Sequence, residues 1–135
     1  TISLAVAPHK LGSESVRRAR SAILRAANAY AKMTTREGYR VPFVGGGSRR
    51  FPWGSNSAIA NNMLLLGLAH QFSQNRGYLN AMLDGMSYLL GENPLRVSYV
   101  TGYGSHAAMQ PHHRFWAQAK NDKYPPPPPG ARRPP

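Results

Sequence analysis

Apolar residues recur at helical spacing in three separate stretches of the sequence. In the first, from Ser13 to about Met33, they are Val16, Ala19, Ile23, Ala26, Ala27 and Tyr30. This spacing of three and four residues predicts an amphipathic helix. Ser13 is a suitable N-cap, because its hydroxyl oxygen can accept a hydrogen bond from an unpaired N–H of the first turn. We expect Gly38 to end this helix.

Two further helices follow. Ser55 or Ser57 can cap the second, which runs to about Phe72, and its apolar residues lie almost all round the axis: Ile59, Met63, Leu64, Leu65, Leu66, Leu68 and Ala69. We expect a helix of this kind to be buried on most sides. The third runs from Gly77 to Leu90, with Leu79, Met82, Leu83, Met86, Leu89 and Leu90 on one face. Because no convincing strand pattern occurs, the fold class is all-α.

The segment from Tyr39 to Arg50 separates the first two helices and contains Pro42 and three consecutive glycines, Gly45 to Gly47. This composition predicts a flexible loop. A glycine run can also form a phosphate-binding loop, but such loops follow a strand and end in Gly-Lys-Ser or Gly-Lys-Thr. Neither feature occurs here, so we interpret the segment as a solvated linker.

The charge balance of the chain points to one further class of partner. The 135 residues include 17 Lys and Arg against 5 Asp and Glu, an excess that is typical of proteins that bind phosphate groups. However, the basic residues are scattered over one helix, a loop and the C-terminal segment rather than gathered in one stripe: Arg17, Arg18, Arg20, Arg25, Arg49, Arg50, Arg132 and Arg133. We therefore expect no nucleic-acid partner, and we keep a basic helical module that binds carbohydrate or nucleic acid as the alternative.

Other compositional features set limits on the class of protein. No hydrophobic run is long enough to cross a bilayer, so no membrane partner is expected. The absence of cysteine excludes a disulfide framework and a thiolate metal site. The chain has no initiator Met, and its first residues lack the pattern of a signal peptide, so we expect an internal fragment.

The loop from Ser98 to Arg114 combines glycines, aromatic residues, three histidines and an arginine. Gly102 and Gly104 bracket Tyr103 and permit backbone angles that other residues avoid, while Pro111 biases Gln110 towards an extended conformation. If residues 111–116 are extended, His112, Arg114 and Trp116 project to one side, and His113 and Phe115 project to the other. Hydrogen-bond donors beside an aromatic ring suit a neutral, hydroxyl-rich sugar.

The residues of this loop resemble a known family signature. Ser98, Val100, Thr101 and Gly104, followed by Pro111, His112 and Arg114, are similar to the histidine signature of glycoside hydrolase family 9, a family of inverting cellulases. The flanking stretches GENPLRVSYVTGYG and RFWAQAKNDKYPPPPPG and the upstream FPWGSNSAIANN are also similar to that family. The resemblance covers nearly the whole chain. His106 departs from it, because the family usually carries Asn, Lys or Arg there.

The resemblance implies a partial (α/α)6 barrel with long loops. Residues 1–124 would form part of a family 9 catalytic domain, and residues 125–135 a Pro-rich tail or a truncated loop. The implied substrate is a β-1,4-glucan, and the implied partner is the missing remainder of the catalytic domain. A secreted or cell-surface location follows from the family alone.

The same resemblance implies the roles of single residues. His112 and Arg114 would be catalytic, and Trp53, Tyr103, His106 and Trp116 would bind substrate. Three histidines, His106, His112 and His113, could also suggest a zinc site, but no Cys or acidic residue lies near them in the sequence. We therefore expect no metal and no cofactor.

Glycoside hydrolysis ordinarily needs two carboxyl groups, one as general acid and one as general base. The chain contains five acidic residues, Glu14, Glu37, Asp84, Glu92 and Asp122, and none forms a recognisable pair. The resemblance places the base in an Asp-rich motif upstream and the acid in an Asn-Glu motif downstream, and neither motif occurs here. We expect this segment to supply substrate-binding residues and to be inactive alone.

Overall fold

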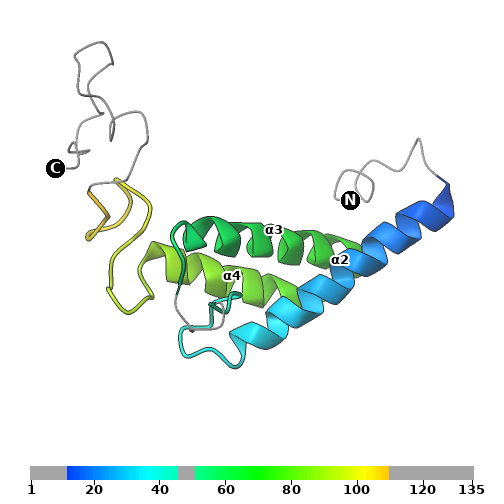
Figure 1. The fold of residues 1–135 in the computed structure, drawn as a ribbon, viewed down its shortest axis with the longest axis horizontal. Coiled ribbons are helices and arrows are strands. Elements are labelled where there is room, and N and C mark those ends of the chain that lie inside the picture. Colours follow the sequence, from blue (N-terminus) through cyan, green and yellow to red (C-terminus); the bar gives the residue numbers. More distant parts are fainter. Residues whose placement is uncertain (1–11, 46–50, 110–135) are drawn as a thin grey trace, which may run out of the picture. The chain divides into compact units, whose positions relative to one another are not determined.

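The computed structural model describes residues 12–45 and 51–109. Three helices account for most of these residues: α2 (Ser13–Thr34), α3 (Ser55–Ser73) and α4 (Arg76–Leu90) (Figure 1). Within the described ranges there is no strand, and the only β pairing is a single bridge between Ser98 and Ala107. The all-α class is therefore confirmed. None of the described helices has the length and apolarity that crossing a membrane requires.

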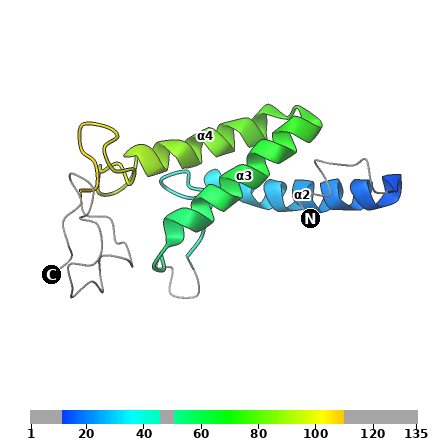
Figure 2. The same cartoon turned by 90° about the horizontal axis from the view of Figure 1, so that it is seen from above.

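The chain divides into two compact units, Thr1–Tyr88 and Leu89–Pro135. In the first unit, α2 packs against α3, and the chain reverses direction between α3 and α4 (Figures 1 and 2). The buried cluster between the helices is formed by Ala19, Ile23, Ala27, Leu66, Ala69, Tyr78 and Ala81. Full burial of one large apolar side chain contributes about 1.5–3 kcal/mol, so this cluster holds the three helices together.

The helix starts differ from the sequence-based expectation. The N-cap of α2 is Gly12 and that of α3 is Gly54, and neither helix has a side-chain cap. Ser13 and Ser55 are already helical, and the hydroxyl of Ser57 donates to the carbonyl of Gly54 at 2.7 Å. The prediction that these serines cap the helices is therefore wrong, because they lie inside the first turn rather than before it.

The turn between α3 and α4 is built by Gln74 and Asn75. Gln74 adopts a left-handed conformation, with φ at 55°, and its N–H donates to the carbonyl of His70. Asn75 then caps α4, since its Oδ1 accepts a hydrogen bond from the N–H of Gly77 at 2.8 Å. A ring nitrogen of His70 lies 3.0 Å from the Asn75 carbonyl oxygen, so His70 stabilises this turn.

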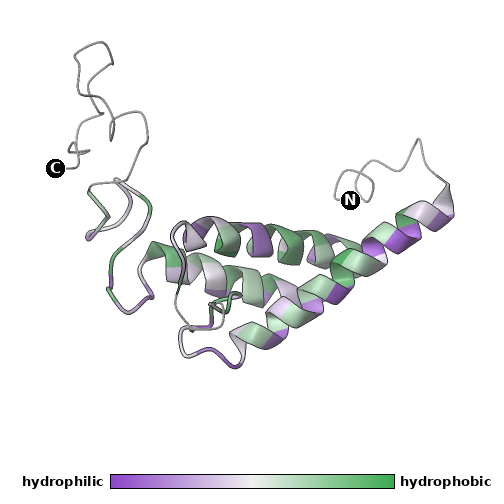
Figure 3. Ribbon diagram, in the orientation of Figure 1, coloured by the Kyte–Doolittle hydropathy of each residue, from purple (hydrophilic) through white to green (hydrophobic). Residues whose placement is uncertain are grey.

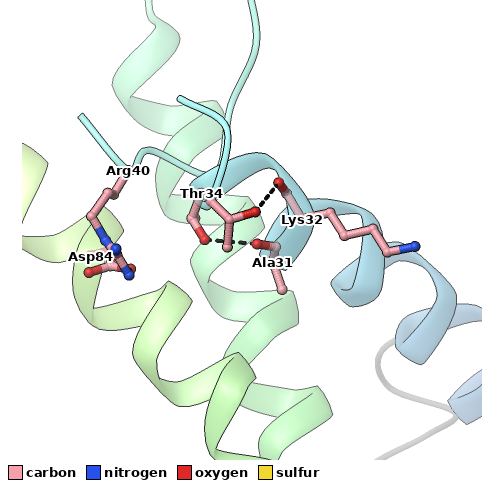
Figure 4. Close-up of polar contacts among 6 residues, drawn as sticks. Ala31, Lys32, Thr34, Arg40 and Asp84 are labelled. Carbon is pink, nitrogen blue, oxygen red and sulfur yellow. Dashed lines mark hydrogen bonds and ion pairs between the residues drawn. The ribbon is translucent and has the colours of Figure 1, made fainter. Parts of the chain in front are cut away.

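The segment after α2 is anchored on the helices. The helix ends at Thr34, before the predicted stop at Gly38, and the hydroxyls of Thr34 and Thr35 donate to the carbonyls of Ala31 and Lys32 (Figure 4). Val41 and Pro42 are buried, and Nδ2 of Asn62 donates to the Pro42 carbonyl at 2.8 Å. A flexible loop was expected from Tyr39 onwards, but this part of it is held in place by packing.

Glycine permits a close approach at the same place. A Cβ built on Gly85 of α4 would lie 2.9 Å from Cγ of Met63 and 3.0 Å from Cδ of Pro42. Only a residue without a side chain fits here. Gly85 therefore lets α4 approach both α3 and the anchored segment.

The apolar surface of α3 extends beyond the face that is covered. Ile59, Met63, Leu66 and Ala69 are buried, whereas Leu64 remains 54% exposed. Figure 3 shows hydrophobic colouring over much of this helix. On α4, Leu83 and Met86 are also exposed. The described part of the chain therefore leaves large apolar side chains in contact with solvent.

Candidate functional site

The predicted site residues fall into three groups. Trp53 belongs to the first unit, and Tyr103 and His106 belong to the second. His112, Arg114 and Trp116 lie outside the described residues. The roles proposed for all six therefore stay predictions. The structure describes the positions of Trp53, Tyr103 and His106.

Trp53 lies in the turn that leads into α3. The following residue, Gly54, has a φ of 77°, and the N–H of Ser55 donates to the carbonyl of Pro52 at 3.1 Å. The Trp53 side chain is 85% exposed. A large aromatic ring in this position is not part of the helix core, and it presents a surface on which a sugar ring can stack.

Tyr103 lies at a glycine-rich turn, as the sequence predicts. Gly102 and Gly104 have φ angles of 73° and 91°, so both occupy the region that favours glycine. The N–H of Tyr103 donates to the carbonyl of Val100 at 3.2 Å, which closes the turn. The phenol ring is 59% exposed. The bracketing role predicted for the two glycines is confirmed.

His106 faces solvent in the same loop. One ring nitrogen lies 3.3 Å from the hydroxyl of Ser105, and the backbone carbonyl of His106 accepts a hydrogen bond from the N–H of Ser98 at 2.7 Å. The backbone of His106 is therefore fixed while its imidazole stays exposed. In the ranges that the structure describes, no three His, Cys, Asp or Glu side chains gather as metal ligands would.

Ser98 is the residue on which this loop closes. It is 2% exposed, its N–H and carbonyl bond to His106 and Ala108, and its hydroxyl lies 3.2 Å from both the N–H and the carbonyl oxygen of Val100. The next residue, Tyr99, donates its N–H to the carbonyl of Leu89 at the end of α4. The loop is thus tied to itself and to the helix end.

Asn93 was not singled out from the sequence, although its side chain organises the turn before Ser98. It is 3% exposed, its Nδ2 donates to the carbonyl of Val97 at 2.9 Å, and its Oδ1 accepts from the N–H of Leu95 at 3.1 Å. The signal was an Asn-Pro pair between a helix and the loop, since Asn often bonds nearby backbone in turns.

Two carboxylates are held by arginines. Glu14 pairs with Arg17 and Arg18 on the first turns of α2. Asp84 pairs with Arg40 at 2.9 Å (Figure 4), and the pKa of Arg40 is raised, first by this hydrogen bond and then by charge attraction. Arg40 therefore stays positively charged. These contacts serve the helices, whereas the loop from Ser98 to Ala108 offers hydroxyl, phenol and imidazole groups suited to binding.

Comparison with solved structures gives the class. The chain aligns with a metagenome-derived glycoside hydrolase family 9 endoglucanase at a TM-score of 0.73 and 35% identity, over 83% of this chain and 20% of that one. A second endoglucanase of the same family, J30, aligns at a TM-score of 0.69 and 28% identity, over 78% and 19% of the two chains. The helices form part of an (α/α)6 barrel, as expected.

Sequence comparison then gives the family. Residues 3–132 match Glycosyl hydrolase family 9, and the chain belongs to this family. A cellulose 1,4-beta-cellobiosidase of Acetivibrio thermocellus is 45% identical over 96% of this chain. Endoglucanase C of Cellulomonas fimi is 33% identical, also over 96%. The chain spans only 15% and 12% of the length of these two relatives.

Proposed function

We propose that this chain is part of a larger catalytic domain that hydrolyses β-1,4-glucosidic bonds in cellulose or related β-glucans, with inversion at the anomeric carbon. The observation that carries the proposal is the family match over residues 3–132. It is supported by relatives whose names describe a cellobiosidase and an endoglucanase. A polymeric substrate of this kind implies action outside the cell, either in solution or at the cell surface.

In this proposal the segment supplies groups that grip the sugar chain. Tyr103 and His106 project from an anchored loop, and Trp53 projects from the turn before α3. Aromatic rings cover the apolar face of a sugar, and an imidazole bonds its hydroxyls. Trp116 would add a second indole, and His112 and Arg114 would act at the point of cleavage.

The general acid and base come from the remainder of the domain. An inverting enzyme places these carboxyl groups about 6.5–9.5 Å apart, so that a water molecule fits between the base and the sugar. Here Asp84 and Glu14 are engaged with arginines. The segment therefore contributes binding, and catalysis requires the rest of the parent protein.

The test compares the 135-residue chain with the complete parent protein. Both are assayed for release of reducing ends from carboxymethylcellulose and from cello-oligosaccharides. We expect turnover from the parent and none above background from the chain alone. Turnover by the purified chain that disappears on Asp84→Ala or Glu92→Ala would contradict the division of roles. Proton NMR of the first product should show the α-anomer, and a β-anomer would refute inversion.

A further inference from the structure

Asn93 and Ser98 are buried polar residues for which the proposed chemistry has no role. Both lie in the second unit, between the end of α4 and the loop that carries Tyr103 and His106. Buried polar side chains are costly unless their hydrogen bonds are satisfied. What these two residues bond to therefore indicates what they do.

The side chain of Asn93 closes the turn that follows α4. Its amide donates to the carbonyl of Val97, and its oxygen accepts from the N–H of Leu95 at 3.1 Å and of Val97 at 3.4 Å. Its own carbonyl accepts from the N–H of Arg96, a residue with a φ of 52°. This one side chain contacts both polar groups of the Val97 backbone, and so it fixes where Ser98 begins.

Ser98 continues this arrangement into the loop. Its N–H and carbonyl hold His106 and Ala108 at 2.7 and 2.8 Å, and its hydroxyl bonds the backbone of Val100. A Cβ on Gly104 would lie 3.6 Å from the Ser98 Cβ, so the two halves of the loop are in contact. The exposed side chains of Tyr103 and His106 are therefore carried on a backbone that Ser98 closes.

We propose that Asn93 and Ser98 are positioning residues that hold Tyr103 and His106 in the conformation that binds the sugar chain. This inference rests on the proposed function. A loop that is ordered before substrate arrives does not lose its backbone freedom on binding, and this preorganisation strengthens the interaction. Neither residue needs to touch the substrate for this effect.

Three variants of the complete parent protein separate the contribution of the Asn93 side chain from that of the Ser98 hydroxyl. Asn93→Ala removes every side-chain bond of the turn. Asn93→Asp keeps the acceptor for Leu95 but replaces the donor to the Val97 carbonyl with an oxygen, so two acceptors face each other. Ser98→Ala removes only the hydroxyl and leaves both backbone bonds. Tyr78→Phe is the matched control, because it removes a hydroxyl that donates to Asn28 at 2.8 Å in the helical cluster.

The first readout is hydrogen exchange, which needs no substrate. Exchange of the Ser98 and Ala108 amides should accelerate in the Asn93 variants. Exchange of the Val100 amide, which donates to the Ser98 hydroxyl, should accelerate in Ser98→Ala. All three amides should be unchanged in Tyr78→Phe. Unchanged exchange in all of them overturns the anchoring role. If the parent protein hydrolyses no β-glucan, the proposed function fails, and this measurement still decides whether the two residues order the loop.

The second readout is kinetic. Misplaced binding groups should lower kcat/KM on cello-oligosaccharides on the order of tenfold to hundredfold, mainly through KM. A merely structural loss would lower the active fraction, and hence kcat, without changing KM. In a background of Tyr103→Ala and His106→Ala, Asn93→Ala should have little further effect, since residues that act together are not additive. Additive losses, or an unchanged KM in the single variants, would overturn the proposal, and Ser98→Ala decides if Asn93→Ala does not fold.

Discussion

Gly102 in the loop combines a positive φ with open surroundings, as Gly54 before α3 also does. Gly102 has a φ of 73° with no atom within 4 Å of an added Cβ, so its conformation alone requires glycine. Gly38 has the same open surroundings, and its φ is not positive. A comparison of Gly102 with Gly38 therefore isolates the cost of the backbone conformation, because neither position is crowded.

The first prediction follows from this pair. In the complete parent protein, Gly102→Ala should lower the free energy of unfolding by about 1–2 kcal/mol, because a side chain is strained in the left-handed region. Gly38→Ala should be neutral or should stabilise by about 0.4–1 kcal/mol, because it restricts the unfolded chain. Urea denaturation of both variants measures the difference, and equal effects would show that the turn can change its backbone conformation.

The second prediction concerns His112 and Arg114. If they contact the reacting sugar, His112→Ala and Arg114→Ala should each lower kcat more than they weaken substrate binding. A contact of the oxyanion-hole kind is worth about 2.7–4 kcal/mol in the transition state. His113→Ala should be milder, because alternation in an extended segment directs it to the other side. Steady-state kinetics test this, and equal losses at all three positions would exclude the extended conformation.

Residues differ in how well their roles can be predicted from sequence. The unusual backbone angles of Gly102 and Gly104 were predicted, because glycine adopts a positive φ far more readily than other residues. Asn93 was not, because an Asn side chain in a turn has several possible backbone partners, and only the folded turn shows which it bonds. The capping role of Ser13 was wrong, because a serine can precede a helix or lie in its first turn equally well.

At the scale of the elements, hydrophobic spacing located the three described helices to within a residue or two, including the end of α2 near Met33, but the stop assigned to Gly38 lies beyond that end. That helix stops at Thr34, and the following segment turns at Arg40, whose φ is 50°. Val41 and Pro42 are then buried against the helices. The sequence could not show this, because Pro and Gly mark a loop without indicating whether the loop packs on a neighbouring helix.

The third prediction compares two helical glycines. Gly85→Ala would place a methyl group within 3.0 Å of Met63 and of the Pro42 ring, and overpacking of this kind costs about 1–3 kcal/mol. At Gly67 the nearest atom is the sulfur of Met82, at 3.1 Å, on a flexible side chain. Both substitutions gain about 1 kcal/mol in helix propensity. Thermal unfolding of the complete parent should therefore show Gly85→Ala as the less stable variant, and the reverse order would mean that α4 can shift away.

At the scale of the whole molecule, the chain spans 15% of the length of a cellobiosidase relative. Apolar side chains on α3 and α4 are exposed to solvent. In a barrel of paired helices, such faces are covered by the neighbouring helices. The apolar pattern of α3 predicted burial on most sides. The described chain buries one side, which fits a helix whose other neighbours are supplied by the rest of a domain.

The fourth prediction is that the isolated chain does not fold cooperatively. Each large side chain left in water forgoes about 1.5–3 kcal/mol, and the whole stability of a small domain is roughly 5–15 kcal/mol. The chain alone should therefore bind hydrophobic dyes and lack a sharp thermal transition, in spite of its formal net charge of +12. A monomer with dispersed side-chain NMR signals and a cooperative melt would contradict this.

The exposed apolar side chains of α3 and α4 also have a consequence for protein engineering. Faces that need a covering partner can serve as the joints of a split enzyme, in which separately expressed pieces regain activity only when they associate. Leu64, Leu83 and Met86 lie on such faces. Because the piece described here would carry the proposed sugar-binding loop, and the flanking upstream and downstream pieces the proposed base and acid, no piece alone would have background activity, and hydrolysis would report their association.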